Sequence, residues 1–160
     1  MNIAIGIAQG IRPLVAYNYA GKAFGRTKAL LNGAVLTMLL YISLALVFVH
    51  LIPEKIIHLF VTDEKAVEIA VYFLEIWTFS IIGLGFIELF NSIFQAFGKW
   101  KLSLANTIVN KGLLLTPVLM LLVSLYGIDG IPYSQVITEN LTAVVLFIIY
   151  LGILRGFKQG

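Results

Sequence analysis

The chain has 160 residues, of which 60% are hydrophobic and 12% are charged, with a formal net charge of +3 at pH 7. A soluble domain is about 45–50% apolar and about 25% charged, and one of this length cannot hide so much apolar surface. The composition therefore excludes an ordinary soluble domain and indicates a protein of the lipid bilayer. Cysteine is absent, which excludes a disulfide framework, a thiolate metal site and a cysteine nucleophile.

Five apolar stretches follow one another, each near the ~20 residues that a transmembrane helix needs. The first contains Arg12 and Pro13, and its Gly6-x-x-x-Gly10 spacing is typical of helices that approach closely. The runs are too continuous for the alternating strands of a membrane barrel. The predicted spans are residues 3–20, 29–52, 67–97, 102–126 and 133–154. The sequence thus predicts an all-α, polytopic membrane protein with about five transmembrane helices.

The connections between these spans carry unequal charge. If five helices alternate in direction, the loop at 21–28, the turn at 98–101 and the C-terminal tail share one side, with seven basic residues and no acid. The other side has two lysines among five acids. Positive charge belongs on the cytoplasmic side, so we expect a cytoplasmic C-terminus. Basic residues spread over short loops also argue against a nucleic-acid partner.

No motif of soluble enzyme chemistry occurs in the sequence: a P-loop, a nucleophile elbow and an HExxH motif are all missing. His50 and His58 lie on opposite sides of Pro53, with no cluster to complete a coordination sphere. We therefore predict no enzyme, no cofactor and no metal site. Residues 53–64 are amphipathic enough to lie along the outer interface, and the Thr62-Asp63-Glu64 run at their end resembles the N-cap of the next helix.

Polar and small side chains recur at helical spacings along the third span. They are Glu68, Tyr72, Glu75, Thr78, Gly85, Glu88, Ser92 and Gln95. A carboxylate at mid-membrane costs ~2.5 kcal/mol or more, so this stripe is expected to face other helices or water. Glu75 and Glu88 either bond to neighbouring helices or bind a proton, a cation or a cationic substrate.

The fourth and fifth spans also have polar faces. In the fourth span the face consists of Ser103, Asn106, Asn110, Pro117 and Ser124, and in the fifth of Gln135, Glu139 and Thr142. Pro117 is expected to free a backbone carbonyl and bend its helix. We expect Lys111 to extend toward the inner membrane surface and Glu139 to be an interfacial residue rather than a ligand. Candidates for a substrate or ion pathway are Glu75, Thr78, Glu88, Gln95, Asn106, Asn110 and Pro117.

Several segments in order along the chain are similar to one transporter family. They are the glycine-rich first span ending in "YNYAGK" (17–22), "HLFVTDEKAVEIAVYFL" (58–74), "FQAFGKWKLSLANTIVNKG" (94–112) and "TPVLMLLVSLYGIDGIPYSQVITENLTAV" (116–144). Together they resemble the C-terminal lobe of the MATE (multidrug and toxic compound extrusion) family, from its second helix onward. The resemblance covers essentially the whole chain, so residues 1–160 correspond to a partial C-terminal transmembrane lobe.

The resemblance implies a cation-coupled antiporter in which sodium ions or protons enter while organic cations or other drugs leave. Family members have two six-helix lobes, so an N-terminal lobe or complementary chain is an expected partner, and the 160 residues alone are not expected to transport. Family coupling carboxylates lie partly in the lobe and the helix that this chain does not cover, and those in the equivalent of the third span would fall near Leu84 to Glu88. The form is closest to the bacterial and archaeal multidrug pumps, which implies the plasma membrane of a prokaryote. Arg12 stands where the family often has glutamine, and in a cavity it would disfavour cationic drugs.

Two other functions are compatible with this sequence. One is a lipid-linked oligosaccharide flippase of the same superfamily, although such proteins line their cavity with many basic residues and the spans here contain only Arg12 and Lys111. The other is a small membrane scaffold or partner subunit with no transport cycle. In that case, the polar stripes would need a partner to cover them.

Overall fold

The computed structural model describes residues 2–156, and in this part of the chain the regular structure is helical, with no strand. The prediction of an all-α membrane fold is confirmed. Its elements are α1 (Asn2–Ala20), α2 (Phe24–Leu51), α3 (Pro53–His58), α4 (Glu64–Thr78), α5 (Ser80–Ala96), α6 (Trp100–Ile108), the π-helix η1 (Val109–Leu114), α7 (Leu115–Tyr126), the 3₁₀ turn η2 (Gly127–Asp129) and α8 (Gly130–Gly156).

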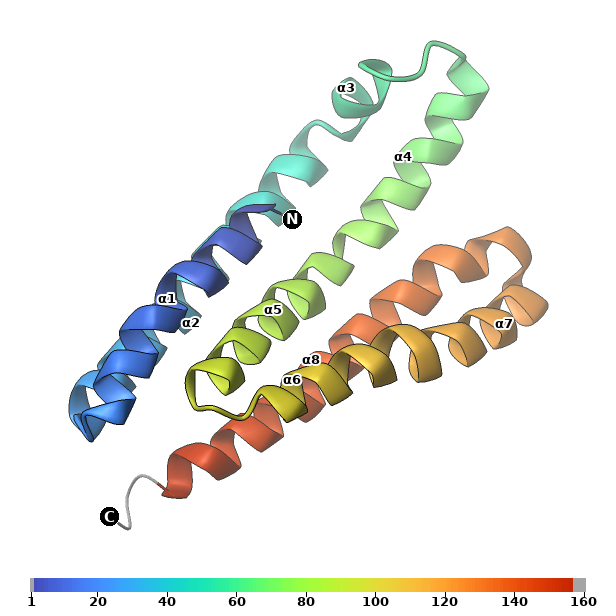
Figure 1. Ribbon diagram of the computed structural model, residues 1–160. Helices are drawn as coiled ribbons and strands as arrows, with labels where there is room; N and C mark the ends of the chain where they lie inside the picture. Colours follow the sequence, from blue (N-terminus) through green and yellow to red (C-terminus); the bar gives the residue numbers. More distant parts are fainter. Residues whose placement is uncertain (1, 157–160) are drawn as a thin grey trace.

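Among the described helices, Phe24–Leu51 and the stretch Trp100–Arg155 are long and apolar enough to cross a membrane, and the bent pair α4–α5 makes a third if it counts as one span. The stretch from Trp100 folds back at Gly127–Asp129, so that α6–α7 and α8 lie antiparallel (Figure 1). The first helix, α1, has 19 residues and contains Pro13.

Helix α5 occupies the centre of the molecule. It packs against α1 on one side and against α8 on the other (Figure 1). Leu89, Phe90, Ile93 and Phe94 are each at most 1% exposed, so the second half of α5 is buried, as expected for a helix surrounded by others. Many apolar side chains of α2, α7 and α8 are exposed by contrast, which suits surfaces in contact with lipid or with further protein.

The predicted third span is broken rather than continuous. Helices α4 and α5 meet at Phe79 with a bend of 40°. The Thr78 hydroxyl donates to the carbonyl of Leu74, a back-bond that bends helices. The Phe79 carbonyl in turn accepts a hydrogen bond from Asn140 of α8 at 3.2 Å. A side chain from another helix therefore satisfies a backbone group at the bend.

The fourth predicted span is also irregular, in the turn before Pro117. Residues Val109–Leu114 form a π-helix, and α7 resumes at Leu115. Proline has no N–H to offer the preceding turn, and a π segment absorbs the missing bond by changing the hydrogen-bond spacing. At the start of α4, Asp63 accepts a hydrogen bond from the Ala66 N–H at 2.9 Å, so the predicted N-cap is confirmed.

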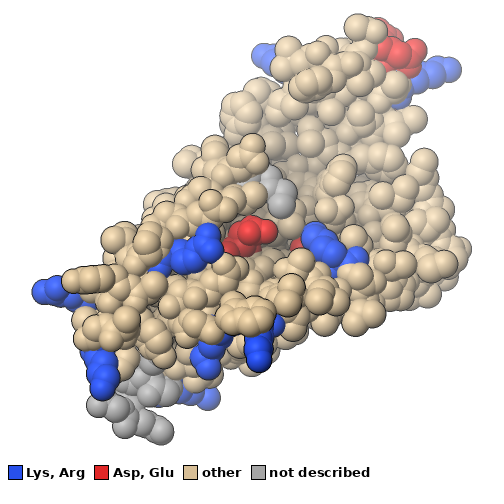
Figure 2. Space-filling model, viewed as in Figure 1, with Lys and Arg blue, Asp and Glu red and all other residues tan. Residues whose placement is uncertain are grey.

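Charged residues gather at the two ends of the molecule, with the unequal distribution that the charges of the connecting segments predicted. Figure 2 shows Lys and Arg gathered without acid at the end near the C-terminus, whereas acids and bases mix at the opposite end. The described residues of the basic group are Lys22, Arg26, Lys28, Lys99, Lys101 and Arg155. Lys158, the seventh member, lies outside the described residues.

Close helix packing occurs at Gly83. The Gly6-x-x-x-Gly10 spacing of α1 makes no such contact among the described residues, since a Cβ at either glycine would meet no atom within 4 Å. A Cβ on Gly83 would lie 2.4 Å from the carbonyl carbon of Glu139. Backbone of α5 and backbone of α8 thus touch, as small residues allow in membrane proteins.

We predict that Gly83→Ala lowers the free energy of unfolding by about 1–3 kcal/mol, because α5 and α8 must separate to admit the methyl group. Denaturant titration in detergent, followed by circular dichroism, measures this. Gly33→Ala is the matched control, since its Cβ meets nothing within 4 Å and alanine is the better helix former. Equal stability of the two variants would contradict the prediction.

Candidate functional site

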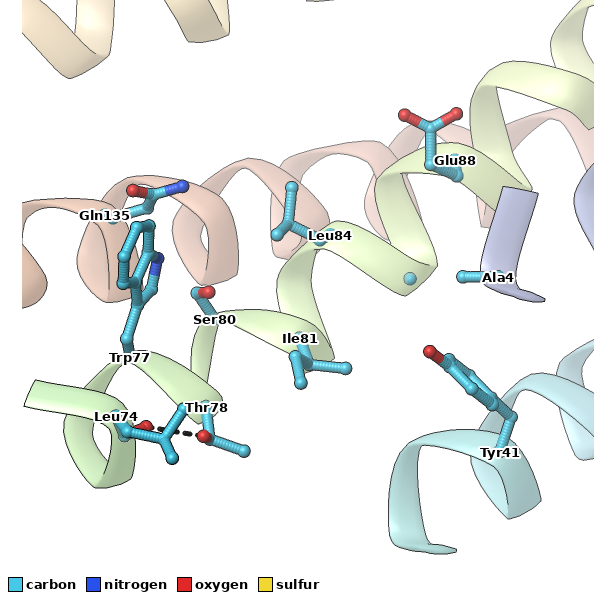
Figure 3. Close-up of a pocket in the computed structure, with 11 residues that line it drawn as sticks. Ala4, Tyr41, Leu74, Trp77, Thr78, Ser80, Ile81, Leu84, Glu88 and Gln135 are labelled. Carbon is cyan, nitrogen blue, oxygen red and sulfur yellow. Dashed lines mark hydrogen bonds between the residues drawn. The ribbon is translucent and has the colours of Figure 1, made fainter. Parts of the chain in front are cut away.

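A cavity of 270 Å³ lies between α1, α2, α4, α5 and the start of α8. Its walls include the aromatic rings of Tyr41 and Trp77, and its polar groups include Thr78, Glu88 and Gln135. Figure 3 shows Trp77 and Gln135 at one end and Glu88 with Ala4 at the other, with Tyr41 projecting from α2. The bend at Phe79 shapes this cavity, because residues on both sides of it contribute to the wall.

Glu88 is the one carboxylate among the residues that line the cavity. It is half-buried and makes no hydrogen bond or ion pair with the described residues. An unpaired carboxylate in apolar surroundings attracts a cation or a proton. Tyr41 and Trp77 also line the cavity, and aromatic rings can attract positive charge through their π-electrons. This cavity is therefore suited to a lipophilic cation.

The other residues of the predicted stripe have different surroundings. Thr78 lines the cavity with its hydroxyl bonded to its own helix, and Glu75 is half-buried outside the cavity lining. Glu68 and Tyr72 are exposed, so the stripe does not face protein along its whole length. Neither Tyr41 nor Trp77 was predicted as a site residue from the sequence. An aromatic side chain in a membrane span can pack in the protein core, face lipid or contact a ligand, and the sequence does not distinguish these.

Hydrogen bonds between side chains join α1, α5 and α6. Arg12 Nη1 donates to Gln95 Oε1 at 2.6 Å, and Gln95 Nε2 donates to Ser103 Oγ at 2.9 Å. Asn106 donates to Asn91 Oδ1 at 3.1 Å. Gln95 and Asn106, both pathway candidates, therefore bond helix to helix. Arg12 is half-buried and is not part of the cavity wall.

Two expectations about charged residues are wrong. Glu139 is 1% exposed rather than interfacial, and it forms an ion pair with Lys111. Lys111 therefore extends across to α8 instead of toward the inner surface. A carboxylate that accepts an ammonium group offsets part of the cost of burying both, and the short turn between α7 and α8 brings them together. The candidate Asn110 belongs to this cluster, whereas Pro117 is exposed.

We predict that Lys111→Gln lowers the free energy of unfolding by about 3 kcal/mol or more, since it leaves the buried Glu139 carboxylate without its partner. Glu139→Gln should lower it by less, because the Lys111 ammonium that remains is half exposed. The double variant Lys111→Gln/Glu139→Gln should lose much less free energy of unfolding than the two single variants lose together. Denaturant titration of the four proteins gives the coupling free energy directly. Additive losses would show that the ion pair contributes nothing to stability.

Comparison with known proteins agrees with the motifs. Residues 1–121 match the sequence model of the MatE family. The chain is 30% identical over 152 residues to the Multidrug export protein MepA of Staphylococcus aureus strain MRSA252, which covers 93% of this chain and 33% of that protein. It is 30% identical over 151 residues to the Multidrug export protein MepA of Staphylococcus haemolyticus, with 92% and 32% covered.

The chain therefore spans about a third of the length of the curated relatives it matches. The family match extends over α1 to the middle of α7 and includes most of the residues that form the cavity wall. Since that match covers well over half of the sequence, the chain belongs to the MatE family.

Proposed function

We propose that the chain forms part of a cation-coupled multidrug efflux antiporter, a transport role and not an enzymatic one. The observation that carries the proposal is the apolar cavity with two aromatic walls and one unpaired carboxylate, Glu88. Such a site suits organic cations that are too varied for a fixed set of hydrogen bonds. The similarity to proteins named for multidrug export supports the same role.

The same carboxylate supplies a mechanism for coupling. Glu88 holds one positive charge at a time, either on an organic cation or as a bound sodium ion or proton. Binding of the coupling ion then releases the drug, and departure of the ion restores the negative charge. Because only one of the two ligands can occupy Glu88 at a time, each lowers the affinity of the site for the other. This mutual exclusion is the minimum that antiport requires.

The transport cycle also needs partners beyond these residues. The relatives are about three times longer, and transporters of this kind work by rocking two repeats about a shared site. We infer that a second lobe, in the same or a complementary chain, covers the exposed apolar faces and completes the cavity. The unequal charge of the two ends supports a cytoplasmic C-terminus in a prokaryotic plasma membrane.

A lipid-linked oligosaccharide flippase fits the cavity less well. A pyrophosphate group needs basic side chains, and the wall of the cavity in the described chain has none. Arg12 and Lys111 are both engaged elsewhere, with Gln95 and Glu139 respectively. A scaffold without transport leaves the unpaired Glu88 unexplained.

We expect tetraphenylphosphonium to quench the fluorescence of Trp77 when it binds the purified chain in lipid nanodiscs. Trp100→Phe is the background, because the chain has two tryptophans. Glu88→Gln should weaken this binding at least tenfold, since the cavity loses its charge. Glu68→Gln is the matched control, an exposed carboxylate on α4 outside the cavity wall. Equal binding by both variants would contradict the proposed function.

We also expect the 160-residue chain to show no ion-driven efflux of a cationic dye by itself in sealed vesicles. One lobe offers no second surface against which the cavity can close and reopen. Fluorescence of an entrapped dye under an imposed sodium or proton gradient measures this. Sustained efflux that collapses with the gradient would refute the two-lobe requirement.

A further inference from the structure

A second cluster of polar groups lies between η1 and α8, apart from the cavity. Asn110 Nδ2 donates to Thr142 Oγ1 at 2.8 Å and to Glu139 Oε2 at 3.5 Å. Thr142 donates in turn to the carbonyl of Thr138 at 2.8 Å. Together with the Lys111 ammonium on Glu139, this arrangement places one cation on a buried carboxylate whose second oxygen accepts from Asn110. Carboxylate oxygens are ligands that hard cations prefer.

One buried hydroxyl on the same stretch of α8 has no partner. Thr138 Oγ1 is buried and makes no hydrogen bond in the described structure. Thr138 precedes Glu139 in the chain and lies one turn from Thr142. A buried hydroxyl without a partner is uncommon and calls for an explanation, such as a ligand that visits the site. An oxygen one residue from Glu139 is therefore unused by other groups of the described chain.

The two members of the ion pair differ in their freedom to move. The Glu139 side chain is 1% exposed and the Lys111 side chain is 50% exposed. Lys111 is also part of the π-helix η1, a kind of turn that is frequent at functional sites. The ammonium, on its flexible stem, leaves the pair without any movement of α8, whereas the carboxylate stays buried.

We propose that Glu139 is a second cation site, in which Lys111 is a tethered cation that a sodium ion or proton displaces. The proposal rests on the proposed ion-coupled function but concerns a site other than Glu88. Binding of a small cation to Glu139 keeps the buried charge neutral and frees Lys111, which then swings to its exposed side. When the ion leaves, Lys111 returns.

This site is mechanically connected to the drug cavity through one short segment of α8. Gln135, one turn before Glu139, is part of the cavity wall. Asn140, the residue after Glu139, bonds to the carbonyl of Phe79 at the bend between α4 and α5. Gly83 lies directly against the backbone of Glu139. Rearrangement at Glu139 is therefore transmitted to the cavity and to the bend.

Other charged groups near Glu139 do not supply this response. Lys111 makes the one ion pair found among the described residues. Helix α5 presents the backbone of Gly83 to Glu139, and α4, which also packs on α8, carries Glu75 without an ion pair. Glu88 of α5 is likewise unpaired and lines the cavity.

The test measures Trp77 emission of the purified chain in nanodiscs, in the Trp100→Phe/Glu88→Gln background, so that an ion bound at Glu88 in the same cavity does not contribute. One arm replaces choline by sodium at constant pH, and the other varies pH at constant sodium, which distinguishes the two ions. We expect the emission to respond in one arm and Glu139→Gln to lose that response. Lys111→Gln should bind the ion about tenfold more tightly, because it lacks the ammonium that competes with the ion for Glu139. In the parent protein, Lys111 is tethered beside Glu139 and so competes at an effective concentration of about a millimolar or above. In the pH arm this raises the midpoint by about one unit.

Two further variants separate this site from a structural role and from Glu88. Lys111→Gln/Glu139→Gln keeps the cluster neutral, so it should fold, as judged by circular dichroism, and give no response. Lys65→Gln, an exposed lysine at the start of α4, should leave the midpoint unchanged. Glu88→Gln should lose tetraphenylphosphonium binding yet keep the ion response, so that the two proposals fail separately.

Glu139→Gln should abolish the ion response, whereas Lys111→Gln should strengthen ion binding. These opposite effects decide between the proposal and a structural role. Loss of stability is expected in both variants on either account, so it does not discriminate; a purely structural ion pair predicts no ion response that depends on Glu139 and no tighter binding in Lys111→Gln. The proposal is overturned if the parent protein responds to neither ion, if Glu139→Gln responds as the parent does, or if Lys111→Gln leaves the midpoint where it was.

Discussion

A polar group among apolar atoms must find its partner inside the protein, because neither lipid nor a hydrocarbon side chain offers one. This constraint explains how the helices are joined. The hydrogen bonds between helices come mainly from a few amides and hydroxyls, such as Gln95, Asn106 and Asn110. Around them the core is apolar and non-directional, so these bonds, and the contact at Gly83, set which faces of the helices meet.

Irregular backbone occurs only where the neighbouring helix can compensate for it. The bend at Phe79 leaves a carbonyl that Asn140 satisfies, and the π-helix before Pro117 lies against the polar face of α8. Both irregularities adjoin α8 between Gln135 and Thr142. The same segment therefore supports a bend, a cavity wall and an ion pair, and a change in one of them reaches the others through short contacts.

The two buried or half-buried acids of the inner helices differ in their surroundings. Glu139 is enclosed and neutralised by Lys111, whereas Glu88 faces an apolar cavity without a partner. A paired carboxylate contributes to the packing of two helices, and an unpaired one is available to a ligand. Glu88 is therefore open to a ligand as it stands, whereas a cation that binds Glu139 must first displace Lys111.

The sequence by itself determined the class of the protein. Apolar runs about as long as the bilayer is thick predict transmembrane helices. The basic residues of the short loops predict which side of the membrane those loops face. Asp63 was recognisable as a helix cap because its hydrogen bond is local, to Ala66. The polar faces were visible too, because helical periodicity places residues three or four apart on one side.

Only the tertiary structure decided which of those polar groups are partners. Lys111 and Glu139 are 28 residues apart, and periodicity does not say which neighbouring helix faces which. For the same reason, the close contact lies at Gly83 rather than at the glycine pair of α1, and Tyr41 and Trp77 meet around one cavity. Contacts between helices depend on the rotation and register of packed rods, and these are set by all the helices together rather than by any one segment.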